Sequence, residues 1–267
     1  MTTAKTEQTT GARTLERSLS INAPIDAVWK ALTDAEELMN WFPPEATVEP
    51  GPGGKIFMRW GDFWQGESDI EVWEPPHHLR TSFDAGVART AVDYYLERDG
   101  NATTLRLVHS GFGKGDDWNT AYDGIRRGWR AELSSLRNYL ENHRGQTRVV
   151  AGARAAFPGS DEAGWAKLRA ALDLPTDVAP GDRLDITIGD DRVQGRVVLS
   201  EAPCQLCAIA DITGGVTTRQ AYFRIELDRC AGSPNALLWL GAFDIDGAEA
   251  ERVEARWTQW LVRAFAN

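Results

Sequence analysis

Apolar and polar residues alternate near the start of the chain, and the spacing then changes. Leu15, Leu19 and Ile21 share one face of an alternating run, which predicts a half-buried strand. Asn22-Ala-Pro24 ends this strand. Apolar positions then recur every three or four residues over 25–32, which predicts a short helix, and Asp34 can cap a second short helix that ends at Trp41.

A series of strands follows, separated by Gly, Pro and Asp-Gly turn signals. The links between the strands are short, so the sheet should be antiparallel. The predicted strands cover residues 55–60, 63–73, 79–83, 90–97 and 103–109.

One long amphipathic helix is predicted over residues 118–142. Its apolar residues recur at spacings of 4, 3, 4, 4, 3 and 4. The sheet is the surface available to bury this stripe. The stripe consists of Trp118, Tyr122, Ile125, Trp129, Leu133, Leu136 and Leu140.

The second half of the chain repeats the landmarks of the first half at offsets of 127 to 131 residues. Pro52-Gly53 corresponds to Pro180-Gly181, and Trp129 corresponds to Trp257. The second copy is shorter before its Pro-Gly turn, which predicts the loss of the second helix and of an edge strand. We therefore expect a disordered tail over residues 1–12, a first domain over 13–144 and a second, degenerate domain over 145–267.

Composition and charge exclude several classes of protein. The 267 residues are 42% hydrophobic and 25% charged, which is typical of a globular protein. The net charge of −10 argues against a nucleic-acid partner and against adhesion to an anionic membrane. Three cysteines cannot form a disulfide framework, and no apolar run suits a membrane span or a signal peptide. We expect a cytoplasmic protein with reduced thiols.

Several segments carry a family resemblance. They are SINAPIDAVWKALTDAEELMNWF (20–42), Gly53-Gly54, EVWEPPHHLRTSF (71–83), TAVDYYLERDGNATTLRLVHSGFG (90–113) and GWRAELSSLRNYLE (128–141). With them the first half resembles the activator of Hsp90 ATPase homologue-like family of the START/SRPBCC (Bet v 1-like) superfamily. The resemblance implies an α+β helix-grip fold, in which a curved antiparallel sheet wraps around a long C-terminal helix and leaves a cavity. The superfamily includes carriers, cyclases and co-chaperone domains, so the fold alone does not select a function.

Strand parity and the helical stripe predict which side chains face this cavity. Most are apolar, and Tyr94 and His109 add polar groups to the wall, as in many small-molecule sites. The alternative is that the same side chains fill a solid core. The predicted ligand-binding residues are Met58, Trp60, Phe83, Tyr94, Leu107, His109, Trp118, Tyr122 and Trp129.

The sequence favours binding over catalysis, and we assign no catalytic residue, cofactor or metal. A lone His109 on an apolar face is more often structural than catalytic, and Cys204-Gln-Leu-Cys207 lacks the second pair that a zinc ribbon needs. The expected partner is a hydrophobic or aromatic small molecule, with the second copy packed beside the first or supporting a homodimer. Two alternatives stay open: a cyclase- or dehydratase-like enzyme that uses the same cavity, and a co-chaperone or other protein-interaction module.

Overall fold

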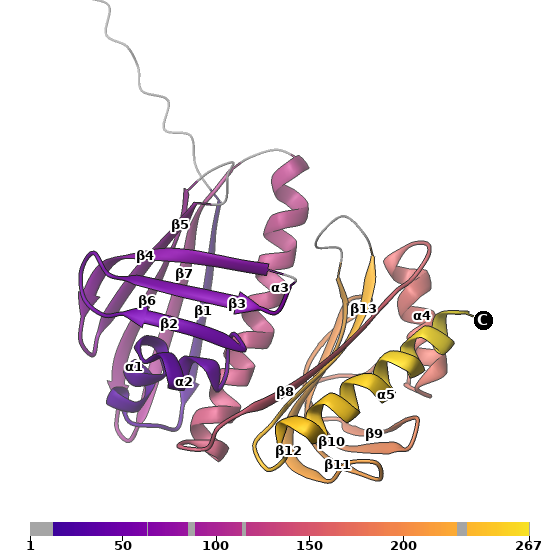
Figure 1. Cartoon of the computed structure of the whole chain (residues 1–267). Helices are drawn as coiled ribbons and strands as arrows, with labels where there is room; N and C mark the ends of the chain where they lie inside the picture. The colour runs from indigo at the N-terminus through magenta and orange to yellow at the C-terminus, as the bar shows by residue number, and fades with distance from the viewer. Residues whose placement is uncertain (1–12, 63, 85–88, 114–115, 229–233, 267) are drawn as a thin grey trace, which may run out of the picture.

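The computed structural model describes residues 13–62, 64–84, 89–113, 116–228 and 234–266, which form two antiparallel sheets with helices (Figure 1). The first sheet has seven strands in the order β1-β7-β6-β5-β4-β3-β2. The second has six strands in the order β8-β13-β12-β11-β10-β9. This arrangement confirms the predicted α+β helix-grip fold in two tandem copies. The predicted tail lies outside the described residues.

The first copy contains every element that the sequence predicts and one additional strand. The additional strand, β2, contributes only Ala46 and Val48 as apolar residues, too few for a pattern to reveal. The elements are β1 (Arg13–Ile21), α1 (Ile25–Thr33), α2 (Ala35–Met39), β2 (Glu45–Glu49), β3 (Lys55–Trp60), β4 (Trp64–Glu74), β5 (His78–Asp84), β6 (Arg89–Asp99), β7 (Ala102–Phe112), α3 (Asp116–Asn138) and a π-helical turn η1 (Tyr139–His143).

The short helices begin where the sequence predicts. Pro24 precedes α1, and the Asp34 carboxylate accepts a hydrogen bond from the Glu37 backbone N–H at 3.1 Å, which caps α2. Trp41 follows α2, is fully buried and donates its indole N–H to the Ala31 carbonyl oxygen at 2.8 Å. These contacts fix the turn that carries Phe42 toward the inside of the sheet.

The long helix α3 packs its apolar stripe against the first sheet, but unevenly along its length. Leu133 and Leu136 are buried in the C-terminal half, and Leu140 is buried in η1, which continues the helix. Trp118 and Tyr122 in the N-terminal half are only half-buried. The helix begins at Asp116, and its last predicted residues form η1. No helix in the described part of the chain is long and apolar enough to cross a membrane.

Within its described residues the second copy repeats this order without counterparts of α2 and β2, as the shorter sequence predicts. Equivalent backbone hydrogen bonds mark the repeat: Gly53 N–H donates to Ile70 at 2.9 Å, and Gly181 N–H donates to Val197 at 2.8 Å. The elements are β8 (Val149–Ala156), α4 (Asp161–Ala171), β9 (Arg183–Ile188), β10 (Asp191–Glu201), β11 (Gln205–Thr213), β12 (Thr218–Asp228), β13 (Asn235–Ala242) and α5 (Gly247–Ala266).

The interior of the second copy is a closely packed core between its sheet and α5. Trp257 of α5 is fully buried and meets Phe223 edge-on, with ring centroids 5.7 Å apart. Val253 and Leu261 of the same helix are also fully buried. All three residues belong to one continuous cluster of buried side chains, so this helix is packed along most of its length.

Helix α3 lies between the two sheets (Figure 1). Its side away from the first sheet contacts the outer face of the second sheet through a small apolar cluster of Ala131, Leu199, Cys207 and Tyr222. The Tyr222 hydroxyl donates to the Ala131 carbonyl oxygen at 2.8 Å. The second sheet is therefore covered on one face by α5 and on the other by the helix of the first copy.

Candidate functional site

The nine predicted lining residues fall into two groups by burial, an inner zone and an outer zone of the first copy. Four of them are buried at its inner end: Tyr94, Leu107, His109 and Trp129. The other five are half-buried and form the outer zone. They are Met58 and Trp60 on β3, Phe83 on β5, and Trp118 and Tyr122 on α3.

Ring contacts connect the inner zone to the outer zone. Trp129 is in contact with Phe42, with ring centroids 5.4 Å apart, and Phe42 meets Trp60 edge-on at 5.1 Å. The Trp64 ring continues this row from Trp60, at 5.3 Å, to Phe83, at 5.7 Å. Trp64 is one of the two large hydrophobic side chains that are exposed within the described residues. The row therefore runs from a buried indole to the surface.

A second row of rings joins His109 to the beginning of α3. The Phe112 ring lies 4.5 Å from the His109 ring between centroids. It also meets Tyr122 edge-on at 5.1 Å and Trp118 edge-on at 6.2 Å. Phe112 therefore connects the buried imidazole of His109 to the half-buried rings of Trp118 and Tyr122.

Sequence parity missed Phe112 and Trp64 as parts of this lining. Phe112 lies on the same strand as His109 but at the opposite parity, and Gly111 between them has φ of +90°. The pairing of β1 with β7 shifts at this point, and the bulge turns Phe112 to the inner face. Trp64 fits because its neighbour is Gly66, where an added Cβ would lie 2.6 Å from the Trp64 ring.

His109 is held by a hydrogen bond from the facing helix. The Trp129 indole N–H donates to His109 Nδ1 at 2.9 Å. His109 Nε2 is buried and has no hydrogen-bond partner among the described residues. Burial lowers the pKa of His109 to about 4, so the imidazole is neutral at neutral pH.

The second polar group on the wall is also neutral. Tyr94 is buried, and desolvation raises the pKa of its hydroxyl. Its ring meets Trp129 edge-on at 6.0 Å. All nine predicted lining side chains are therefore uncharged at neutral pH, which suits a neutral ligand better than an ionic one because an unpaired charge is costly to bury.

Charged side chains gather on the outer face of the first sheet instead. Asp93 is buried there between His78 Nε2, at 2.8 Å, and Arg80 Nη1, at 2.5 Å. Arg80 also pairs with Glu71 at 2.9 Å, and Arg89 pairs with Asp69 at 2.7 Å. These carboxylates are engaged in a surface ion-pair ladder and do not reach the inner lining.

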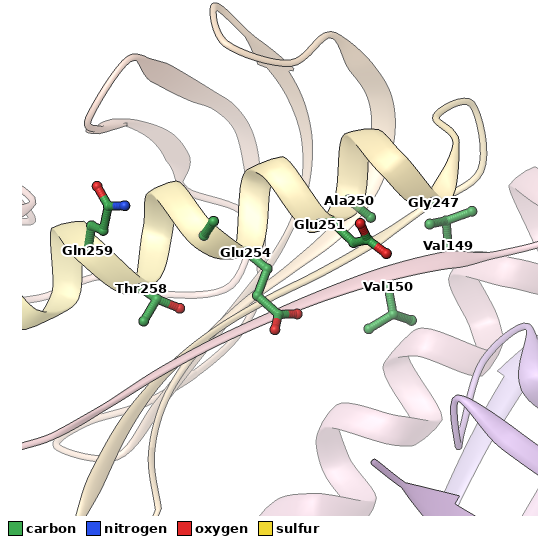
Figure 2. A pocket seen from close by; sticks show the side chains of 9 residues that line it. Val149, Val150, Gly247, Ala250, Glu251, Glu254, Thr258 and Gln259 are labelled. Atoms are coloured by element: carbon green, nitrogen blue, oxygen red, sulfur yellow. The ribbon is translucent and has the colours of Figure 1, made fainter. Parts of the chain in front are cut away.

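Two hollows that the structure outlines lie away from this lining. One has a volume of about 600 Å³ and lies between α5 and the start of β8, where Glu251 and Glu254 project beside Val150 (Figure 2). Glu254 accepts a hydrogen bond from the Gly152 backbone N–H at 3.1 Å, so part of this hollow supports the sheet edge. The other has a volume of about 360 Å³ and lies near the start of α1. Neither hollow includes any of the nine predicted residues.

The first copy matches one protein-family model. Residues 22–141 match the model described as Activator of Hsp90 ATPase homolog 1-like protein. The first copy is similar to this family over these residues. The match confirms the resemblance that the sequence motifs indicate, and it ends within η1, before the second copy begins. No curated protein matches the chain significantly.

Solved structures that are similar to this chain cover either about half of it or nearly all of it. CalU16 from Micromonospora echinospora is 25% identical, with 49% of this chain and 78% of that chain covered and a TM-score of 0.42. DynU16, from the dynemicin biosynthetic locus, is 18% identical over 95% of this chain and 96% of that chain, with a TM-score of 0.44. BexL, a di-domain ARO/CYC from the BE-7585A biosynthetic pathway, is 12% identical over 96% and 99%, with a TM-score of 0.45.

The second copy differs from the family-matched copy at the polar centre of its interior. Leu240 stands on β13 where the repeat places His109 on β7. The indole N–H of Trp257 donates instead to the Asp191 carboxylate at 2.9 Å. Asp191 is fully buried and also accepts from Arg256 and from the Val216 backbone N–H. The second copy has replaced the imidazole contact with a carboxylate that has several donors.

Proposed function

We propose that the first copy binds a hydrophobic or aromatic small molecule between its sheet and the N-terminal half of α3. The observation that carries the proposal is the half-buried state of the five outer lining residues. Burial of a large aromatic side chain is strongly stabilising, because each can bury 150–250 Å². A ligand among Trp60, Phe83, Trp118 and Tyr122 would remove this apolar surface from water.

The contrast between the copies supports the same conclusion. In the second copy the corresponding helix is buried along its apolar stripe, and its tryptophan N–H is bound by a carboxylate. In the first copy the N-terminal half of α3 is packed less closely, and a buried imidazole nitrogen lacks a partner. We infer that binding belongs to the first copy and that the second copy has a structural role.

The binding experiment uses a neutral aromatic probe, N-phenyl-1-naphthylamine, whose fluorescence rises in apolar surroundings. The full-length protein should bind it, and Tyr122→Ala and Trp60→Ala should each weaken binding about tenfold, because each removes apolar contact area worth about 1–2 kcal/mol. Trp239→Ala is the control, since Trp239 is a half-buried tryptophan of the second copy. Probe binding that is absent, or that is equally weakened by Trp239→Ala, would contradict the proposal.

Native mass spectrometry of the same protein tests two further expectations. A mass above that of the 267-residue chain would reveal a co-purified ligand, and the charge-state series would report whether the chain forms the expected homodimer. Thermal stabilisation by the identified ligand should increase with its concentration, as mass action requires. Cytoplasmic location remains a prediction from the sequence.

The geometry of His109 does not favour the alternative of an acid–base enzyme. A general base must accept a proton at the nitrogen that faces the substrate. In the first copy the free lone pair of His109 is directed to the indole N–H of Trp129. We therefore favour a binding function over a catalytic one. The protein-interaction alternative remains a prediction, and absence of probe binding would favour it.

A further inference from the structure

The two ring nitrogens of His109 have different surroundings. Nδ1 lies 2.9 Å from the indole nitrogen of Trp129, and Nε2 is buried without a partner among the described residues. An indole N–H can only donate a hydrogen bond. Nδ1 must therefore be the acceptor, and in the neutral imidazole the ring proton is on Nε2.

A buried N–H without an acceptor is destabilising, because the group has lost its hydrogen bonds to water. The groups around it do not supply a replacement. The neighbouring ring is Phe112, and the β6 residue paired with His109 is Val92. The first copy thus contains one fixed, uncharged donor inside an aromatic lining.

We propose that the ligand of the first copy carries an uncharged acceptor oxygen, such as the carbonyl of an aryl ketone, that binds the Nε2–H of His109, and that Trp129 is the positioning residue that fixes this donor. This inference rests on the proposed function and specifies the ligand class. A carboxylate is a poorer candidate, because none of the nine lining residues supplies a cation to offset its desolvation. A pure hydrocarbon would leave the donor unsatisfied.

The second copy shows what the same interior does without this donor. Leu240 replaces the imidazole, and Trp257 donates to Asp191, so the tryptophan N–H remains satisfied. The pairing of Trp129 with a histidine is therefore not the only way in which this fold can satisfy the helix tryptophan. It is the arrangement that also presents a donor to the interior.

A matched pair of probes tests the inference: α-tetralone and tetralin share one bicyclic skeleton and differ in a single carbonyl. Isothermal titration with the full-length protein should show that α-tetralone binds about tenfold more tightly, the effect of one buried hydrogen bond. In His109→Leu this preference should disappear, so that the two probes bind with similar affinities. His77→Leu is the matched control, because His77 lies at the β4–β5 turn, and it should keep the wild-type preference.

Trp129→Phe tests the positioning role. The phenyl ring keeps aromatic packing but removes the indole N–H, so His109 can adopt either tautomer. We expect the ketone preference to fall to about threefold and the ¹⁵N NMR signals of His109 to change from a single Nε2–H tautomer to a mixture. A structural role alone would lower stability without changing the tautomer.

Each outcome separates this inference from the proposed function. Equal binding of both probes to the wild-type protein, or a wild-type His109 that carries its proton on Nδ1, would overturn the acceptor-oxygen inference and leave small-molecule binding intact. Failure of α-tetralone, tetralin and N-phenyl-1-naphthylamine to bind would overturn the proposed function itself. The wild-type NMR measurement remains decisive even if His109→Leu does not fold.

Discussion

Burial holds His109 in its uncharged form, and its protonation is therefore linked to folding. The pKa of this imidazole is about 4 in the folded protein, below its ordinary value of 6.5. Between these two values the unfolded chain binds more protons than the folded chain, so stability falls as the pH is lowered through this range. Above pH 6.5 the contribution of His109 is fully present.

The first prediction concerns this pH dependence. Between pH 7.5 and pH 4.5, the free energy of unfolding of the wild-type protein should fall by roughly 2 kcal/mol more than that of His109→Leu. Urea unfolding at the two pH values measures the difference. The same pH dependence in both proteins would show that the imidazole is not kept neutral by the fold.

The inner lining shows how far individual residues could be predicted. Parity predicts that Tyr94, Leu107 and His109 share one face, and all three side chains are buried on strands that keep a regular register up to residue 109. Phe112 was missed, since the bulge at Gly111 reverses the parity that follows. The contact between His109 and Trp129 depends on side-chain rotation across two elements, which no pattern in the sequence encodes.

At the scale of elements, α3 has partners on both sides. Its apolar stripe was evident in the sequence, and the structure buries this stripe against the first sheet. Its other side carries Glu132, which accepts a hydrogen bond from Arg224 of β12 at 2.8 Å. Arg224 also pairs with Glu226 on its own strand. One guanidinium thus neutralises two carboxylates between the copies.

The second prediction follows from this arrangement. Arg224→Met should lower the free energy of unfolding by roughly 3 kcal/mol, because it leaves Glu132 and Glu226 without their shared cation. Glu132→Gln should cost only about 1 kcal/mol, since the amide oxygen can still accept from Arg224, which keeps Glu226. Chemical denaturation compares the two variants.

A surface arginine provides the control for that comparison. Arg192 of β10 pairs with Asp185 in solvent, and Arg192→Met should change the stability little. If Arg224→Met and Arg192→Met have similar effects, the charges between the copies do not contribute as proposed. If Glu132→Gln lowers the free energy of unfolding more than Arg224→Met does, the Glu132 carboxylate contributes more to stability than the Arg224 guanidinium.

At the scale of the whole molecule, the sequence predicted two copies but not how they pack. Collinear landmarks revealed the repeat, and the shorter second copy revealed the missing α2 and β2. The face of the second sheet that meets α3 carries Gln205, Cys207, Arg224 and Glu226. Polar residues at one parity usually indicate a solvated face, so the sequence gives little reason to expect that this face is covered.

The last prediction tests whether the second copy is held on α3 by this contact. Ala131 is fully buried against Leu199 and Tyr222 at the centre of the small apolar cluster, and the first core lies on the other side of the helix. Ala131→Arg should overpack this contact and separate the copies while each core stays folded. Small-angle scattering should show a larger radius of gyration, and trypsin should cleave faster after the exposed Arg144 in the linker.

Ala163→Arg, an equal change at an exposed position of α4, should alter neither measurement. Binding of N-phenyl-1-naphthylamine should survive in both variants, because the proposed site lies on the opposite side of α3; an unchanged radius of gyration in Ala131→Arg would show that other contacts hold the copies together.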